Sequence, residues 1–143
     1  MFFVPGVVRG QGSLTLWRAD DGTERVKHPQ STIAWRNIVI ATLRREWAGR
    51  PPIRGPVAVT LVALYGRPLA HLGTGRNAGM LKPSAPVLKT GAPDLDKVIR
   101  GIGDALTQSG VLADDNLIAV WAAHARWADL DQTPGARITV REL

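Results

Sequence analysis

Two pairs of aspartates in the second half of the chain are the residues best suited to metal chemistry. Asp94 and Asp96 stand at the start of an apolar run, and Asp114 and Asp115 follow 18 and 19 residues after Asp96. Carboxylates brought close together cannot all stay ionised without a cation. The chain has no cysteine, and oxygen ligands alone select a hard ion, so the expected metal is Mg²⁺ or Mn²⁺.

Helix capping is the competing explanation for the first pair. Asp94 follows Pro93 and precedes the apolar run, where a carboxylate accepts backbone N–H bonds and meets the positive end of the helix dipole. Asp96 gains from the same dipole. The second pair favours the metal site, on the condition that the strand after Asp115 runs alongside the start of the helix.

The positive charge of the chain is concentrated in one long segment. The net charge is +6, and residues 25–93 carry eleven Lys or Arg against a single acid, Glu46. Such a segment attracts a polyanion, although charge that serves only solubility is the competing explanation. Beside a carboxylate-bound metal, a cationic surface indicates phosphodiester hydrolysis, in which the metal polarises the phosphoryl oxygen and activates a water.

Residues 66–93 form the least regular part of this segment. They contain five glycines, four prolines and no acid. A connection of this length is expected to be either a functional loop or a disordered one. Its cations Arg67, Arg76, Lys82 and Lys89 are the candidate contacts to a nucleic-acid backbone.

The elements that must position these residues follow from periodicity and turn signals. We expect a hairpin from Leu14 to Lys27 around Asp21-Gly22, a helix over 31–47 capped by Ser31 or Thr32, a strand over 55–66, a helix over 94–108, and strands over 116–127 and 136–142. This order predicts a single α+β domain, residues 1–143, with a small mixed or antiparallel sheet and two main helices. Gly101 and Gly103 inside the second helix are expected to permit close packing, and the five tryptophans to pack in the core or at an interface rather than stack on bases.

The class of protein is bounded by what the sequence lacks. No apolar stretch reaches the roughly 18 residues that a membrane span needs, and the N-terminal run is broken by Pro5 and Gly6, unlike a signal peptide. The absence of cysteine fits a reducing compartment. We therefore expect a cytoplasmic protein.

The stretch "PDLDKVIRGIGDALTQSGVLADDNLI", residues 93–118, resembles the signature of RusA-type Holliday junction resolvases. "PGARITV" near the C-terminus resembles the closing strand of that family. The resemblance implies a small homodimer that binds four-way DNA junctions and nicks two opposed strands, using Mg²⁺ or Mn²⁺. It also implies that Asp94, Asp96 and Asp115 are metal ligands, with Asp114 as a supporting acid.

Three positions depart from the family pattern. Lys97 stands where the family has Asn, Arg100 where it has an essential Lys, and Ala92 where a basic residue is common. Arginine and lysine differ in geometry and in their ability to shift pKa. The expectation is that Arg100 replaces the family Lys in catalysis with help from Lys97. The alternative is a catalytically impaired protein of the same fold that only binds branched DNA.

Other polar residues are expected to have lesser roles. Asp104, one turn after Arg100, is expected to pair with it. His124 and Arg126 share one strand face, where they either border DNA or are simply solvated. A phosphohydrolase acting on nucleotides is disfavoured, because such enzymes place their D-x-D motif directly after a hydrophobic strand, and here a Pro/Gly loop precedes it.

Overall fold

The computed structural model describes residues 1–11, 15–18, 20–27 and 30–143, and Leu14 of the expected hairpin lies outside this part. Its strands are β1 (Phe2–Pro5), β2 (Thr15–Arg18), β3 (Glu24–Lys27), β4 (Val57–Tyr65), β5 (Ile118–Trp127) and β6 (Gly135–Glu142). Its two α-helices are α1 (Gln30–Trp47) and α2 (Leu95–Gln108). Three short 3-10 helices, η1 (Leu69–His71), η2 (Gly75–Asn77) and η3 (Asp115–Leu117), lie in the connections.

The main sheet has the order β1-β6-β4-β5 and is mixed. β4 pairs with β5 in parallel and with β6 in antiparallel orientation, so Leu61 lies between Ala123 and Ile138. β1 pairs with the other side of β6. The α+β prediction with a mixed sheet and two main helices is confirmed.

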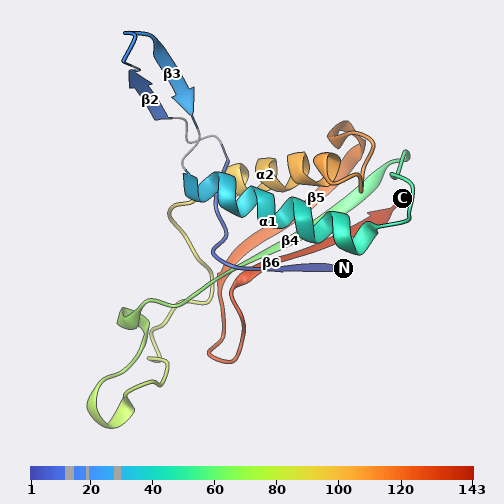
Figure 1. Cartoon of the computed structure of the whole chain (residues 1–143). Coiled ribbons are helices and arrows are strands. Elements are labelled where there is room, and N and C mark those ends of the chain that lie inside the picture. The colour runs from blue at the N-terminus through green and yellow to red at the C-terminus, as the bar shows by residue number, and fades with distance from the viewer. Residues whose placement is uncertain (12–14, 19, 28–29) are drawn as a thin grey trace.

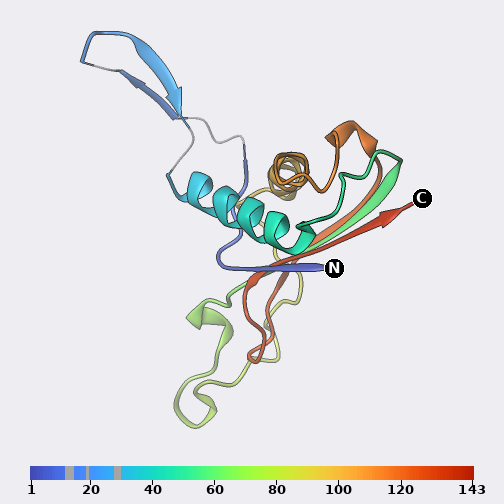
Figure 2. The same ribbon diagram turned by 45° about the vertical axis from the view of Figure 1, so that its right-hand side comes forward.

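Both α-helices lie on one face of this sheet (Figure 1, Figure 2). Alternate residues of β4 and the apolar stripe of α2 meet in the core between the two layers, as strand and helix periodicity require. The fully buried members from these elements include Val57, Val59, Leu61, Ile102 and Leu106. α2 is thereby fixed above β5 and β4.

The two glycines of α2 face neighbouring segments on two sides of the helix. A Cβ on Gly103 would lie 3.8 Å from the Trp121 ring, and a Cβ on Gly101 would lie 3.4 Å from the Cβ of Gln11. Both distances are ordinary van der Waals contacts, so a methyl group would fit at either position and the close packing expected there does not require glycine. The helix is held between β5 and the N-terminal segment.

Four of the tryptophans pack against protein rather than stand free for base stacking. Trp35 is buried in the core, and Trp47, Trp121 and Trp127 pack against it half-buried. The expectation of packing holds for these four. The side chain of Trp17 lies outside the described residues.

Two expectations about the N-terminal part need correction. β1 was missed, because a four-residue strand that ends in Pro5 gives too short a period-2 signal. The first long helix begins at Gln30, so Ser31 and Thr32 lie in its first turn instead of capping it. The hairpin is confirmed as β2 pairing with β3 around Asp21-Gly22, and it projects away from the sheet in Figure 1.

Residues 66–93 form a folded excursion beyond the end of β4 (Figure 1). Its two arms are joined by backbone hydrogen bonds from Gly73 to Met80 (2.8 Å) and from Lys82 to His71 (3.0 Å). We call residues 66–93 the basic loop. No helix within the described residues is long and apolar enough to cross a membrane.

The contact between α2 and the sheet predicts a specific stability difference between two leucines. Leu106→Ala, at a fully buried position, should lower the free energy of unfolding by about 2–5 kcal/mol, because it removes buried methyl groups and leaves a cavity. Leu69→Ala, at a position 84% exposed, is the matched control and should change it by less than about 0.5 kcal/mol. Urea unfolding measures both, and equal effects would contradict this packing.

Candidate active site

Asp94 lies at the N-cap of α2 with its carboxylate free of capping bonds. Its backbone is extended (φ −65°, ψ 138°), and its carbonyl accepts hydrogen bonds from the N–H groups of Lys97 (3.1 Å) and Val98 (3.2 Å). Asp94 is at the N-cap as predicted, but its carboxylate makes no cap hydrogen bond, so the expected bond to backbone N–H groups is absent. Lys97 Nζ lies 3.5 Å from Asp94 Oδ2. The helix start therefore presents this carboxylate outward, beside one cation.

Asp96 and Arg100 are exposed one turn apart on α2. Within the described residues neither side chain has a hydrogen bond or an ion pair. The pairing expected between Arg100 and Asp104 is not observed, because the Asp104 carboxylate instead accepts a hydrogen bond from Gln11 Nε2. Arg100 is thus left available to an external anion.

The second acidic pair lies just before β5. Asp114 caps η3, and its Oδ1 accepts a hydrogen bond from the N–H of Asn116 at 2.9 Å. Asp115 is exposed, and its carboxylate has no partner in the described part of the chain. The N–H of Ala113 donates to the carbonyl of Ile53 (2.9 Å), which ties this turn to the chain just before β4.

The two acidic pairs lie at opposite ends of α2. The helix has 14 residues, which span roughly 21 Å. Asp94 borders a hollow of about 400 Å³ beside Ala123, His124 and Ala125 of β5, whereas Asp115 precedes the first residue of that strand. Across the described residues no three His, Asp or Glu side chains lie close enough to hold a metal ion. The condition for convergence is therefore not met within one chain.

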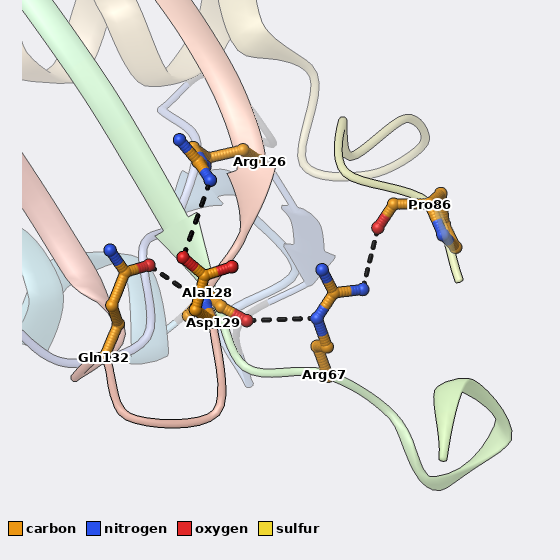
Figure 3. A network of polar contacts seen from close by, with 6 residues as sticks. All are labelled: Arg67, Pro86, Arg126, Ala128, Asp129 and Gln132. Carbon is orange, nitrogen blue, oxygen red and sulfur yellow. Dashed lines mark hydrogen bonds and ion pairs between the residues drawn. The ribbon is translucent and has the colours of Figure 1, made fainter. Parts of the chain in front are cut away.

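Arg67 joins the base of the basic loop to the turn between β5 and β6. Its Nε donates to the carbonyl of Ala128 (3.1 Å) and its Nη1 to the carbonyl of Pro86 (2.7 Å), as Figure 3 shows. The same turn holds an ion pair of Arg126 with Asp129 at 3.8 Å. The guanidinium of Arg67 thus serves as a structural tie between segments far apart in sequence.

Lys89 lies against aromatic rings and backbone carbonyls just before the acidic helix start. Its Nζ lies 4.4 Å from the Tyr65 ring centroid and donates to the carbonyls of Gly91 (3.2 Å) and Ala92 (2.7 Å). Its N–H donates to the carbonyl of Ala125 (3.0 Å). Burial lowers the pKa of Lys89, and the charge of Asp94 opposes that shift. Lys89 therefore fastens the chain that leads into Asp94 to the edge of β5.

The other two cations of the basic loop are exposed. Arg76 lies in η2, and Lys82 lies on the returning arm. Neither side chain has a hydrogen bond or an ion pair in the described ranges. The four cations predicted to contact DNA are therefore of two kinds, two engaged with the protein and two facing solvent.

Arg9, Gln11 and Tyr65 were missed by sequence reasoning. Arg9 lines a hollow with Asp94 and Lys97, although it precedes them by more than 80 residues and carries no local motif. Burial raises the pKa of Tyr65 to about 12, against an opposing effect of the Arg9 charge. The Tyr65 hydroxyl is buried and has no hydrogen-bond partner among the described residues. Only pairing across the fold could have identified these residues.

The match to known families covers this whole arrangement. The profile described as Endodeoxyribonuclease RusA matches residues 8–141. The chain belongs to the RusA endodeoxyribonuclease family. The curated proteins compared with it contain no match.

Membership of this family indicates the class of reaction to which these residues belong. RusA proteins are endodeoxyribonucleases that act on Holliday junctions in DNA recombination and repair, and they generally depend on a divalent metal ion. The match spans the acidic helix start, the basic loop and Asp115 together. It also includes Arg9 and Gln11, the N-terminal residues that lie against α2.

The contacts of Lys89 predict a role in stability that Lys82 does not share. Lys89→Met should lower the free energy of unfolding by about 1 kcal/mol, because the carbonyls of Gly91 and Ala92 lose a charged donor. Lys82→Met, in the same loop, is the matched control and should stay within about 0.5 kcal/mol of the unaltered protein. Urea unfolding checks both, and an unchanged midpoint for Lys89→Met would refute the anchoring role.

Proposed function

We propose that this chain is a homodimeric, Mg²⁺- or Mn²⁺-dependent resolvase that cuts two opposed strands of a four-way DNA junction. The observation that carries the proposal is the pair of helix-start carboxylates, Asp94 and Asp96, presented without capping bonds in a cationic chain of the RusA family. Uncapped carboxylates are available to a metal. The surrounding positive charge favours DNA over a small uncharged substrate.

The proposed metal ligands are Asp94, Asp96 and Asp115, with Asp114 in support. Their hard oxygen donors suit Mg²⁺ or Mn²⁺. Asp114 has one oxygen engaged with Asn116, so it has less to offer than the other three. A metal bound there would polarise the phosphoryl oxygen and lower the pKa of an attacking water.

The separation of the acids favours a site shared between two copies. One chain holds Asp94 and Asp115 at opposite ends of a helix roughly 21 Å long, too far apart to share an ion. A second copy can supply the missing carboxylate. β5 is an edge strand of the sheet, and edge strands readily pair with a second chain.

The free part of this edge suggests how the copies would meet. The basic loop occupies the outer edge of β5 from Ala125 to Trp127 through backbone hydrogen bonds, which leaves Ile118 to His124 open within the described chain. Antiparallel pairing of two copies about Trp121 would place Ile118 opposite His124. Asp115 of one copy would then lie level with Trp127 of the other, close to the hollow that Asp94 borders.

Such a pairing has two-fold symmetry, and each dimer would hold two equivalent sites. A four-way junction offers two opposed strands related by a similar two-fold axis. Two sites in one dimer would therefore account for paired nicks.

The cations of the site divide into those beside the acids and those on the basic loop. Arg100, without a partner in the described part of the chain, is proposed to bind the scissile phosphate through its guanidinium fork, with Lys97 assisting. Arg76 and Lys82 are proposed to contact the DNA backbone directly. Arg67 and Lys89 add positive charge and hold the basic loop in place.

The first prediction concerns metal-dependent nicking. With Mg²⁺ the protein should nick a four-way junction symmetrically, and Asp96→Asn should reduce nicking at least 100-fold while leaving junction binding intact, because it removes a ligand but no phosphate contact. Asp131→Asn, an exposed loop acid, is the matched control and should cut normally. A gel assay on the junction and a matched duplex, with and without Mg²⁺, measures all of these.

Two outcomes of that assay would point elsewhere. Salt-sensitive junction binding with no nicking would favour the catalytically impaired alternative, for which Arg100 in place of the family Lys is the motivating observation. Arg100→Lys should then gain activity. If the protein neither binds nor cuts branched DNA, the proposal is rejected.

The shared site makes a separate prediction for mixed dimers. Asp96→Asn and Asp115→Asn should each be inactive alone. A purified dimer with one chain of each kind would hold one site with both substitutions and one site with neither, so it should regain single nicks without paired cutting. If both acids of a site came from one chain, every site would carry a substitution, and an inactive mixed dimer would rule out sharing.

A further inference from the structure

A second hollow lies on the opposite side of Asp94 from β5. Its volume is about 430 Å³, and its lining includes Arg9, Ser31, Thr32, Asp94 and Lys97. It lies where the N-terminal segment passes between the starts of α1 and α2. Asp94 therefore borders two hollows, one toward the edge of β5 and one toward Arg9.

The charges around this second hollow leave one cation unbalanced. Among the described residues that line it, Asp94 is the single acid, and Lys97 Nζ lies 3.5 Å from that carboxylate. Arg9 is exposed, and its guanidinium has no hydrogen bond or ion pair with any described residue. Two cations against one carboxylate favour an anion, and the guanidinium fork of arginine matches a phosphate.

The position of Arg9 is built into the fold. The N–H of Gln11 donates to the carbonyl of Lys97 at 3.0 Å, and the Gln11 side chain donates to Asp104 two turns further along α2. At Gly10, which stands between Arg9 and Gln11 in the chain, an added Cβ would lie 3.0 Å from the Cβ of Lys97. Residues 9–11 therefore lie tightly along α2 in one register, which keeps Arg9 beside Lys97.

We propose that Arg9 and Lys97 together bind a phosphodiester of the DNA strand that runs past Asp94. The assignment rests on the proposed function, because it names the backbone contact next to the proposed metal ligands. Ser31 and Thr32 add hydroxyl groups to the wall of the same hollow. The bound phosphate would fix the strand relative to Asp94 from the side opposite to the partner copy.

Junction binding in EDTA, where no metal supports cutting, tests the assignment through its salt dependence. Arg9→Ala should weaken binding roughly tenfold and reduce the magnitude of the negative slope of log K against log salt by about 1, because one phosphate contact is lost. Lys97→Ala should reduce the magnitude of the slope similarly. Arg9→Lys should retain the slope, since the charge is kept.

Arg45→Ala is the matched control, since Arg45 is exposed in the last turn of α1, at the other end of that helix. It should change the slope by less than half as much. A slope for Arg9→Ala equal to that of the unaltered protein, or an equal loss in Arg45→Ala, would overturn the assignment while leaving the proposed function intact. Failure of the unaltered protein to bind junctions would reject both.

Discussion

The rigid length of α2 is the constraint on which the rest of the site depends. The helix is held from two sides, with Gly103 against Trp121 of β5 and Gly101 against Gln11 of the N-terminal segment. An α-helix rises about 1.5 Å per residue, so a helix seated in this way keeps its two ends at a set distance. Acids that are close in sequence terms are therefore held far apart in space.

Because of that separation, pairing of two copies at the β5 edge of the sheet would be needed to bring the acids together. A single chain presents Asp94 and Asp96 at one end of α2 and Asp115 at the other, each with open oxygens. Within one chain this spacing keeps Asp115 from sharing a metal ion with Asp94 and Asp96, because ligands of one ion lie about 2.1 Å from it. Catalysis would then depend on assembly, so a protomer alone would not cut DNA.

The positive charge of the chain is put to two uses. Arg67 and Lys89 direct their donors at backbone carbonyls and hold the basic loop against β5 and the turn that follows it. The loop has no acid, so carbonyls and aromatic faces take the place of carboxylates as partners. Arg76 and Lys82, exposed farther along the loop, and Arg9 beside α2 keep their charge open to an external anion.

The sequence by itself determined the main elements and indicated the family. Periodicity located both helices and the long strands, and the spacing from Asp94 to Asp115 indicated the family. Local patterns of this kind depend on each residue's near neighbours in the chain, so they can be recognised without knowledge of the tertiary structure. β1 was not predicted, because a strand of four residues is too short to show a clear alternation of apolar and polar side chains.

The tertiary structure alone decided which residues meet. It separated Asp115 from Asp94, gave Asp104 to Gln11 instead of Arg100, and placed Arg9 beside Lys97. It also distinguished the anchoring cations Arg67 and Lys89 from the exposed ones, although all four look alike in sequence. The reason is that contacts between residues far apart in the chain follow from how helix and sheet pack, and no local pattern records that packing.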